Sequence, residues 1–116
     1  MGTMKDRLKD VAELTAKLKK KYPSEINAFM TFVEKAESGP ALTSREKELI
    51  NVALSIAGQC EWCIAVHVKH AVAAGATRDE IVEAGFMAVV MHGGPALMFM
   101  TLLFQALDEF IPEKDT

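Results

Sequence analysis

Aromatic side chains are scarce in this 116-residue sequence, making up only 7% of it. Hydrophobic residues still make up 50%, so a buried core must be built mainly from Ala, Leu, Val, Ile and Met. That mixture favours helices over strands. Positive charge is also sparse, because the formal net charge is −3 and basic residues cluster only at Lys17–Lys21. The sequence therefore lacks the electrostatic signature of a nucleic-acid-binding protein.

Long uninterrupted hydrophobic segments are also missing. The first twenty residues alternate charged and apolar side chains, and we expect no secretory signal there. Between Ala84 and Gln105 the one ionisable side chain is His92, but Gly93-Gly94-Pro95 divides the stretch into halves shorter than a membrane span. We therefore expect two buried helices and no membrane partner. Two cysteines three residues apart, without an export signal, favour a reducing compartment and predict a cytoplasmic protein.

Helix-start signals recur along the chain, without a strand pattern, a glycine-rich phosphate loop or an internal repeat. Thr43 with Glu46, and Thr77 with Glu80, have the spacing of capping boxes, in which two side chains satisfy the first free N–H groups of a helix. Proline and glycine mark several helix ends. The pattern predicts six helices: Asp6–Lys21, ended by Tyr22-Pro23; a second capped by Ser24 and ended by Ser38-Gly39-Pro40; a third from Thr43 to Gly58; a fourth from about Cys60 to Ala74, ended by Gly75; a fifth from Thr77 to Gly93; and a sixth from Pro95 to Phe110.

The predicted fold is therefore all-α, with one domain spanning residues 1–116. Within it we expect N-terminal helices over 1–39, a helical core over 40–110 and a polar tail over 111–116. The last two helices are apolar on more than one face. A domain this small cannot cover so much apolar surface by itself, so we expect copies of the chain to bury it between them as a homo-oligomer.

The two cysteines form a Cys-x-x-Cys motif that is followed four residues later by a histidine. On a helix, Cys60, Cys63 and His67 lie at about 0°, 300° and 340° around the axis, so they share one stripe. A helix N-terminus favours thiolate. The second cysteine can resolve a sulfenic acid, and a histidine one turn away can take the thiol proton. If the third and fourth helices form a hairpin, Glu48 could face His67 and orient it.

Other interpretations of these residues remain open. Cys60, Cys63, His67 and His70 read as a C-x2-C-x3-H-x2-H zinc pattern, but Cys60 and His70 would lie about 15 Å apart on one helix. We therefore expect no metal, and we place His70 at the rim of the stripe. His67 could be an ordinary helix histidine, and Glu48 could be a plain surface carboxylate.

Glu48, twelve residues before Cys60-x-x-Cys63-x-x-x-His67, resembles the signature of the alkylhydroperoxidase AhpD-like, carboxymuconolactone decarboxylase superfamily. The resemblance covers about residues 40 to 107. Three further segments also resemble the family: Leu42–Ile50 the lead-in to the signature, His70–Glu83 the helix hairpin after it, and Gly93-Gly94-Pro95 a later turn.

The resemblance implies an all-helical AhpD-like fold that assembles as trimers or hexamers. It also implies thiol-dependent peroxidase activity that requires no haem, flavin or metal. By position, Cys63 would attack a small hydroperoxide, Cys60 would resolve the product, and His67 with Glu48 would relay the proton. An external dithiol or lipoyl-bearing partner would then reduce the Cys60–Cys63 disulfide.

Two other functions are compatible with the sequence. One is a cofactor-free decarboxylase of a small carboxylated lactone, in which His67 or His92 would handle the proton. The other is a non-catalytic helical oligomer whose thiols sense redox state. Dependence of activity on the thiols separates the peroxidase from the decarboxylase, and turnover with a dithiol reductant separates it from the sensor.

Overall fold

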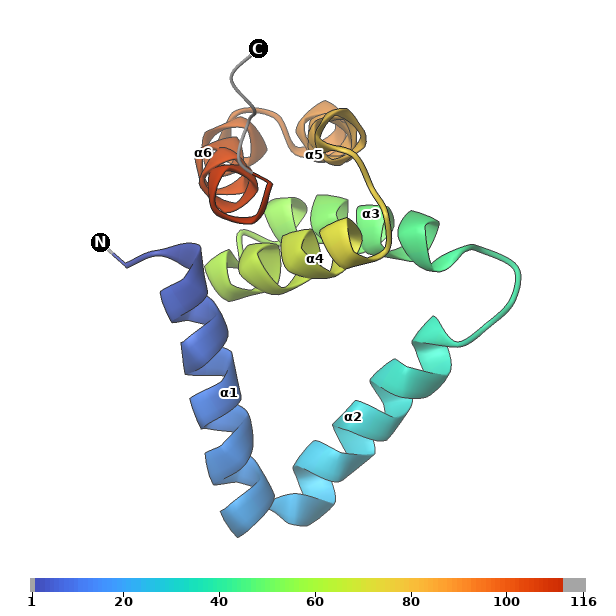
Figure 1. Cartoon of the computed structure of the whole chain (residues 1–116), viewed down its shortest axis with the longest axis vertical. Helices are drawn as coiled ribbons and strands as arrows, with labels where there is room; N and C mark the ends of the chain where they lie inside the picture. The colour runs from blue at the N-terminus through green and yellow to red at the C-terminus, as the bar shows by residue number, and fades with distance from the viewer. Residues whose placement is uncertain (1, 112–116) are drawn as a thin grey trace.

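The computed structural model describes residues 2–111, and in this part of the chain every regular element is an α-helix. Figure 1 shows how the helices are arranged. Their bounds are α1 Met4–Lys21, α2 Pro23–Glu37, α3 Ser44–Ala57, α4 Glu61–Ala73, α5 Arg78–His92 and α6 Gly94–Phe110. The predicted all-α fold with six helices is confirmed for the described residues.

Three of the helices begin with a capping box. The two predicted boxes are confirmed: Thr43 caps α3 together with Glu46, and Thr77 caps α5 together with Glu80. In each box the threonine backbone N–H donates to the glutamate, at 2.8 Å for Glu46 and 2.9 Å for Glu80. These hydrogen bonds hold the pKa of both carboxyls below the ordinary value, because they favour the ionised form.

The third capping box corrects the first predicted helix. Thr3 caps α1 together with Asp6, so the helix begins at Met4 rather than at Asp6. The predicted cap of the second helix is also wrong. Tyr22 is the N-cap of α2 and Pro23 takes its first turn, which places Ser24 inside the helix. Of the predicted polar tail, residues 112–116 lie outside the described part of the chain.

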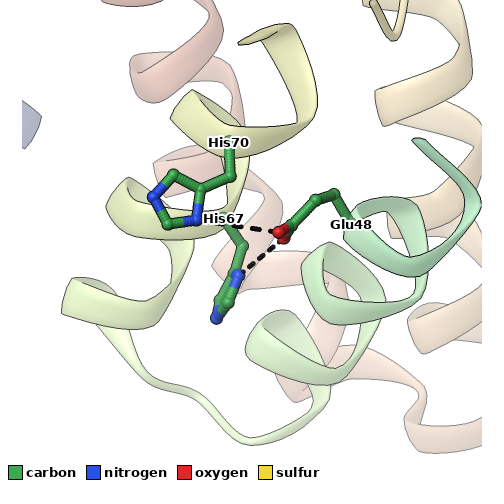
Figure 2. A group of neighbouring side chains, drawn as sticks. All are labelled: Glu48, His67 and His70. Carbon is green, nitrogen blue, oxygen red and sulfur yellow. Dashed lines mark hydrogen bonds and ion pairs between the residues drawn. The ribbon is translucent and has the colours of Figure 1, made fainter. Parts of the chain in front are cut away.

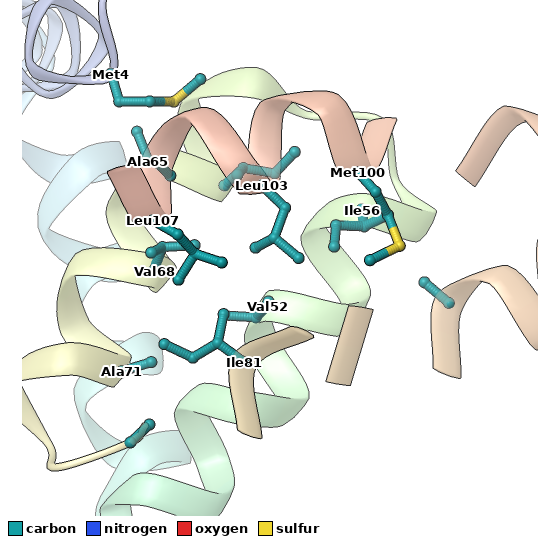
Figure 3. Close-up of a cluster of buried hydrophobic side chains, with 14 of the residues drawn as sticks. Met4, Val52, Ile56, Ala65, Val68, Ala71, Ile81, Met100, Leu103 and Leu107 are labelled. Carbon is teal, nitrogen blue, oxygen red and sulfur yellow. The ribbon is translucent and has the colours of Figure 1, made fainter. Parts of the chain in front are cut away.

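Helices α3 to α6 form the core of the molecule (Figure 1). The hairpin of α3 and α4 packs against α5 and α6, and aliphatic side chains from all four helices fill the space between them (Figure 3). Gly85 allows α5 to approach closely. A Cβ built there would lie 2.8 Å from Leu103 Cδ2 and 3.2 Å from Ile56 Cδ1. The fully buried larger side chains are Met4, Val52, Ile56, Ile64, Val68, Ile81, Leu103 and Leu107.

Helices α1 and α2 form an arm that projects from the core as a V (Figure 1). The arm is attached through the start of α1, where Met4 is buried and the backbone N–H groups of Met4 and Lys5 donate to the Glu109 carboxylate. No residue of α2 is buried, although Phe29 and Phe32 lie on it.

None of the helices described here is long and apolar enough to cross a bilayer.

Candidate active site

The turn between α3 and α4 positions the dithiol. The backbone N–H of Gln59 donates to the carbonyl of Ile56, and that of Cys60 donates to the carbonyl of Ser55, both at 3.1 Å. This is the Schellman pattern that closes a helix, and it needs a left-handed residue. That residue is Gln59, with φ of 53°, because Gly58 has a right-handed backbone. Gly58 is thus the C-cap, and the chain reverses one residue later.

Cys60 is at the same time the N-cap of α4. Its Sγ accepts a hydrogen bond from the backbone N–H of Cys63 at 3.1 Å, so α4 begins at Glu61 rather than at Cys60. The two cysteines are joined by a disulfide, with their Cα atoms 5.2 Å apart. The predicted dithiol therefore lies in the first turn of a helix, where unpaired N–H groups and the helix dipole stabilise negative charge.

Glu48 on α3 and His67 on α4 face each other across the hairpin (Figure 2). Glu48 Oε1 lies 2.9 Å from His67 Nδ1, and the Asn51 side-chain amide donates to the same oxygen at 3.3 Å. The Glu48 side chain is only 12% exposed and that of His67 is 24% exposed. The sequence predicted a contact between Glu48 and His67 only if the third and fourth helices form a hairpin, and this contact is present. It occupies Nδ1 and leaves Nε2 as the nitrogen that can serve a thiol or a water molecule.

His70, which the sequence placed at the rim, lies closer to this pair than expected. Its Nδ1 is 3.7 Å from Glu48 Oε2, and its ring makes an edge-on contact with that of His67 at 5.9 Å between centroids. The side chain is 54% exposed. The three-residue spacing of the histidines signalled a shared helix face, but only the tertiary structure shows that both rings reach Glu48. His92 ends α5, is exposed, and is not part of this cluster.

A cavity of about 440 Å³ opens beside His67. Its wall is mostly apolar and comes from the arm and the core together, since Phe32 and Val33 belong to α2 while Ile50 belongs to α3. Leu42, from the connection between these helices, also lines the apolar part. None of these four residues was a predicted site residue, because an apolar side chain carries no chemical signature in the sequence.

The residues between the cysteines connect the site to α1. Glu61 accepts two hydrogen bonds from the Arg7 guanidinium, at 2.5 and 3.1 Å. The Trp62 ring N–H donates to Asp10 at 3.0 Å, so its side chain points away from the cysteine stripe as expected. The arm is therefore anchored to the same helical turn that carries the disulfide.

The family assignment follows from comparison with known sequences. The model of the carboxymuconolactone decarboxylase family matches residues 23–106, which include α2, the dithiol segment and most of α6. This chain belongs to the carboxymuconolactone decarboxylase family. The predicted resemblance is confirmed at this level.

Three similar proteins each match most of this chain. The chain is similar to a carboxymuconolactone decarboxylase family protein from Legionella pneumophila, whose crystal structure superimposes with a TM-score of 0.89 at 36% identity, covering 95% of this chain and 97% of that one. It is 39% identical over 83 residues to "uncharacterized protein 4 in cox locus" of Paracoccus denitrificans, covering 72% of this chain and 75% of the relative. It is also 30% identical over 96 residues to an uncharacterised protein of Cupriavidus necator, covering 83% of this chain and 85% of that relative.

Proposed function

We propose that this family member is a thiol-dependent peroxidase, a disulfide oxidoreductase that cycles Cys60 and Cys63 between dithiol and disulfide. The observation that carries the proposal is the position of the disulfide. It lies in the first turn of α4, one turn before the residue that hydrogen-bonds to Glu48. Thiolate is favoured at such a helix N-terminus, and a base held by a carboxylate follows directly.

In the proposed cycle, Cys63 is the nucleophile. Its thiolate forms a bond to one peroxide oxygen while the O–O bond breaks, and the leaving alkoxide takes up a proton to become an alcohol. Cys63 is then a sulfenic acid. The Cys60 thiol attacks the Cys63 sulfur, the sulfenic oxygen leaves as water, and the Cys60–Cys63 disulfide forms. An external dithiol, such as a lipoyl group, reduces this disulfide and becomes a disulfide itself.

His67 and Glu48 are proposed to move the protons in this cycle. Nδ1–H of His67 donates to Glu48, so Nε2 is the unprotonated nitrogen and can accept the Cys63 proton. The resulting imidazolium lies against a carboxylate that is only 12% exposed, and this ion pair stabilises it. The same proton can then be delivered to the leaving alkoxide.

The cavity beside His67 supports a substrate class. Its apolar side chains, among them Phe32, Leu42 and Ile50, suit an alkyl group better than they suit hydrogen peroxide alone. We therefore propose a small organic hydroperoxide as the substrate, with its alkyl group between α2 and α3.

We also propose that the protein works as a homo-oligomer, a trimer or a hexamer. The support is the apolar surface that a single chain leaves uncovered on α2, α5 and α6, where Phe32, Val90, Met91 and Met98 are each at least 68% exposed. Light scattering on the purified protein tests this: a monomeric mass at working concentration would contradict it.

A hydroperoxide assay with dihydrolipoamide as reductant tests the proposed activity. The parent protein should consume cumene hydroperoxide, and mass spectrometry should show peroxide-dependent formation of the Cys60–Cys63 disulfide. Cys63→Ser should reduce consumption to background, because it removes the nucleophile. His67→Gln should slow the reaction by about 10²-fold or more, the usual contribution of a positioned general base.

His92→Gln is the matched control, since His92 lies outside the Glu48–His67–His70 cluster and should leave turnover unchanged. Turnover that survives both Cys60→Ser and Cys63→Ser would overturn the peroxidase proposal and favour a thiol-independent reaction. Disulfide formation without sustained turnover would instead indicate a redox sensor.

A further inference from the structure

The Glu48 carboxylate lies between two imidazole rings. Its Oε1 is 2.9 Å from His67 Nδ1, and its Oε2 is 3.7 Å from His70 Nδ1 (Figure 2). One ligand atom from each of the three residues lies within 4.8 Å of the other two. In a tetrahedral zinc site with bonds of about 2.1 Å, ligand atoms are about 3.4 Å apart, so shifts of roughly an ångström would complete the geometry.

The donor set has the chemistry of a transition-metal site. Two imidazoles and one carboxylate are common ligands of Zn²⁺ and of neighbouring first-row divalent ions. His67 and His70 are three residues apart and project from one helix, while Glu48 comes from the facing helix. Three protein ligands leave room for water in the remaining position, as in catalytic rather than structural zinc sites.

The charge balance and access around Glu48 also favour a cation. Among the described residues, the groups within ion-pair or hydrogen-bond distance of this carboxylate are His67, His70 and the Asn51 amide, and no lysine or arginine pairs with it. A largely buried carboxylate without a fixed cation gains from a divalent ion. His70 is more than half exposed, and His67 borders the open cavity, so an ion can reach the three ligands from solvent.

We infer that Glu48, His67 and His70 bind one divalent transition-metal ion, for which Zn²⁺ is the natural test, with water completing its coordination. This site differs from the Cys-x2-Cys-x3-His-x2-His pattern of the sequence. It uses Glu48 from α3 and needs neither cysteine, so it is complete when the cysteines are joined as a disulfide.

Ion binding also has a consequence for the thiol cycle, and that consequence rests on the proposed function. Coordination through His67 Nδ1 requires the tautomer that carries its hydrogen on Nε2. In that form Nε2 cannot accept the Cys63 proton. The ion and the proton relay therefore exclude each other at His67, and the bound ion inhibits the oxidation of Cys63.

Calorimetric titration of metal-stripped, disulfide-bonded protein with Zn²⁺ tests the site without interference from thiolates. We expect one ion per chain. His70→Gln should weaken binding by more than about tenfold, because loss of even an outer partner of a metal ligand costs 10–100-fold. His92→Gln is the matched control and should leave the affinity unchanged. Circular dichroism confirms that each variant is folded, which is expected because both side chains are exposed.

Absence of Zn²⁺ binding to the oxidised parent protein would overturn the site, as would an affinity that His70→Gln leaves intact. The inhibition is measured separately, as single-turnover oxidation of pre-reduced, reductant-free protein by cumene hydroperoxide. Zn²⁺ should slow this step in the parent at much lower concentration than in His70→Gln. Equal inhibition of the parent and of His70→Gln would show that the ion acts on the thiols. That result would overturn the competition between the ion and the proton relay at His67. If the oxidised protein binds Zn²⁺ but the protein shows no peroxidase activity in the hydroperoxide assay, the proposed function is contradicted and the metal site is still supported.

Discussion

The core and the arm differ in how much of their apolar surface the chain itself covers. In the core, aliphatic side chains from α3 to α6 are fully buried against one another, whereas Met4 is the one buried side chain of the two arm helices. The Glu48–His67–His70 cluster and the disulfide are carried by core helices. The arm contributes Phe32 and Val33 to the cavity wall and little to the core. Most of the buried packing therefore lies in the core, whereas the arm supplies part of the cavity wall.

The largest difference is expected between Leu103→Ala in the core and Phe32→Ala in the arm. Leu103 is fully buried, so its truncation should lower the free energy of unfolding by about 2–5 kcal/mol. Phe32 is 68% exposed in the single chain, so in protein dilute enough to be monomeric its truncation should change that free energy by no more than about 0.5 kcal/mol. Urea unfolding of both variants measures the two values. A loss at Phe32 as large as the loss at Leu103 in the monomer would contradict the comparison, whereas a loss that appears only where the protein assembles is expected from the proposed homo-oligomer.

A smaller difference is expected between two glycines. A methyl group at Gly85 would meet Leu103 and Met100 side-chain atoms at 2.8 and 3.1 Å, whereas one at Gly39 would meet no atom within 4 Å. Gly85→Ala should cost about 1–3 kcal/mol from overpacking, partly offset by the better helix propensity of alanine. Gly39→Ala, in the connection from arm to core, should be near neutral. Thermal unfolding compares the pair, and a stabilised Gly85→Ala would show that the core is less tightly packed than the contacts imply.

The smallest expected effect is the pH dependence of the capping boxes, which begin a helix in both the arm and the core. Hydrogen bonds from their N-cap threonines lower the pKa of Asp6 in the arm and of Glu46 in the core. Because the folded-state pKa is the lower one, the stabilisation by Glu46 is present above its ordinary value of 4.5 and is lost as pH falls through the folded-state pKa. Glu46→Gln should therefore be less stable than the parent at neutral pH, and the gap should close in acid.

The unfolding midpoint, followed from neutral pH to below 4.5, measures this gap. Asp6→Asn should show a gap of the same sign that also closes in acid, because hydrogen bonds with Thr3 lower the pKa of Asp6 as well. A pH-independent gap for Glu46→Gln would contradict the assigned cause of the shift.

Much of the fold could be predicted because its signals are local. Thr43 with Glu46 and Thr77 with Glu80 mark helix starts through contacts only three residues long. Thr3 with Asp6 carries the same signal with a shorter carboxylate, and it would have placed the first helix start correctly. Ser24 misled because it is a strong N-cap residue, while Pro23 fixes a helical φ one residue earlier.

The site was only partly predictable, for a different reason. The spacing of Cys60, Cys63 and His67 follows from one helix, and Glu48 could be matched to His67 from the register of a hairpin. The approach of His70 to the second carboxylate oxygen depends on the tertiary position of α3, which no periodicity encodes. The cavity wall from α2 likewise depends on how the arm is set against the core.

Cys60 lies between two helices and completes the end of one and the start of the other, which matters for choosing the residue that replaces it. Its backbone N–H completes the terminal turn of α3, and its sulfur caps the backbone of α4 at Cys63. Serine offers an oxygen in nearly the same place and is among the preferred N-cap residues, whereas alanine offers no acceptor. Cys60→Ser therefore removes the thiol chemistry alone, and Cys60→Ala also weakens the helix start. The difference in stability between the two variants measures what the Cys60 side chain contributes as a helix cap, apart from the loss of its thiol.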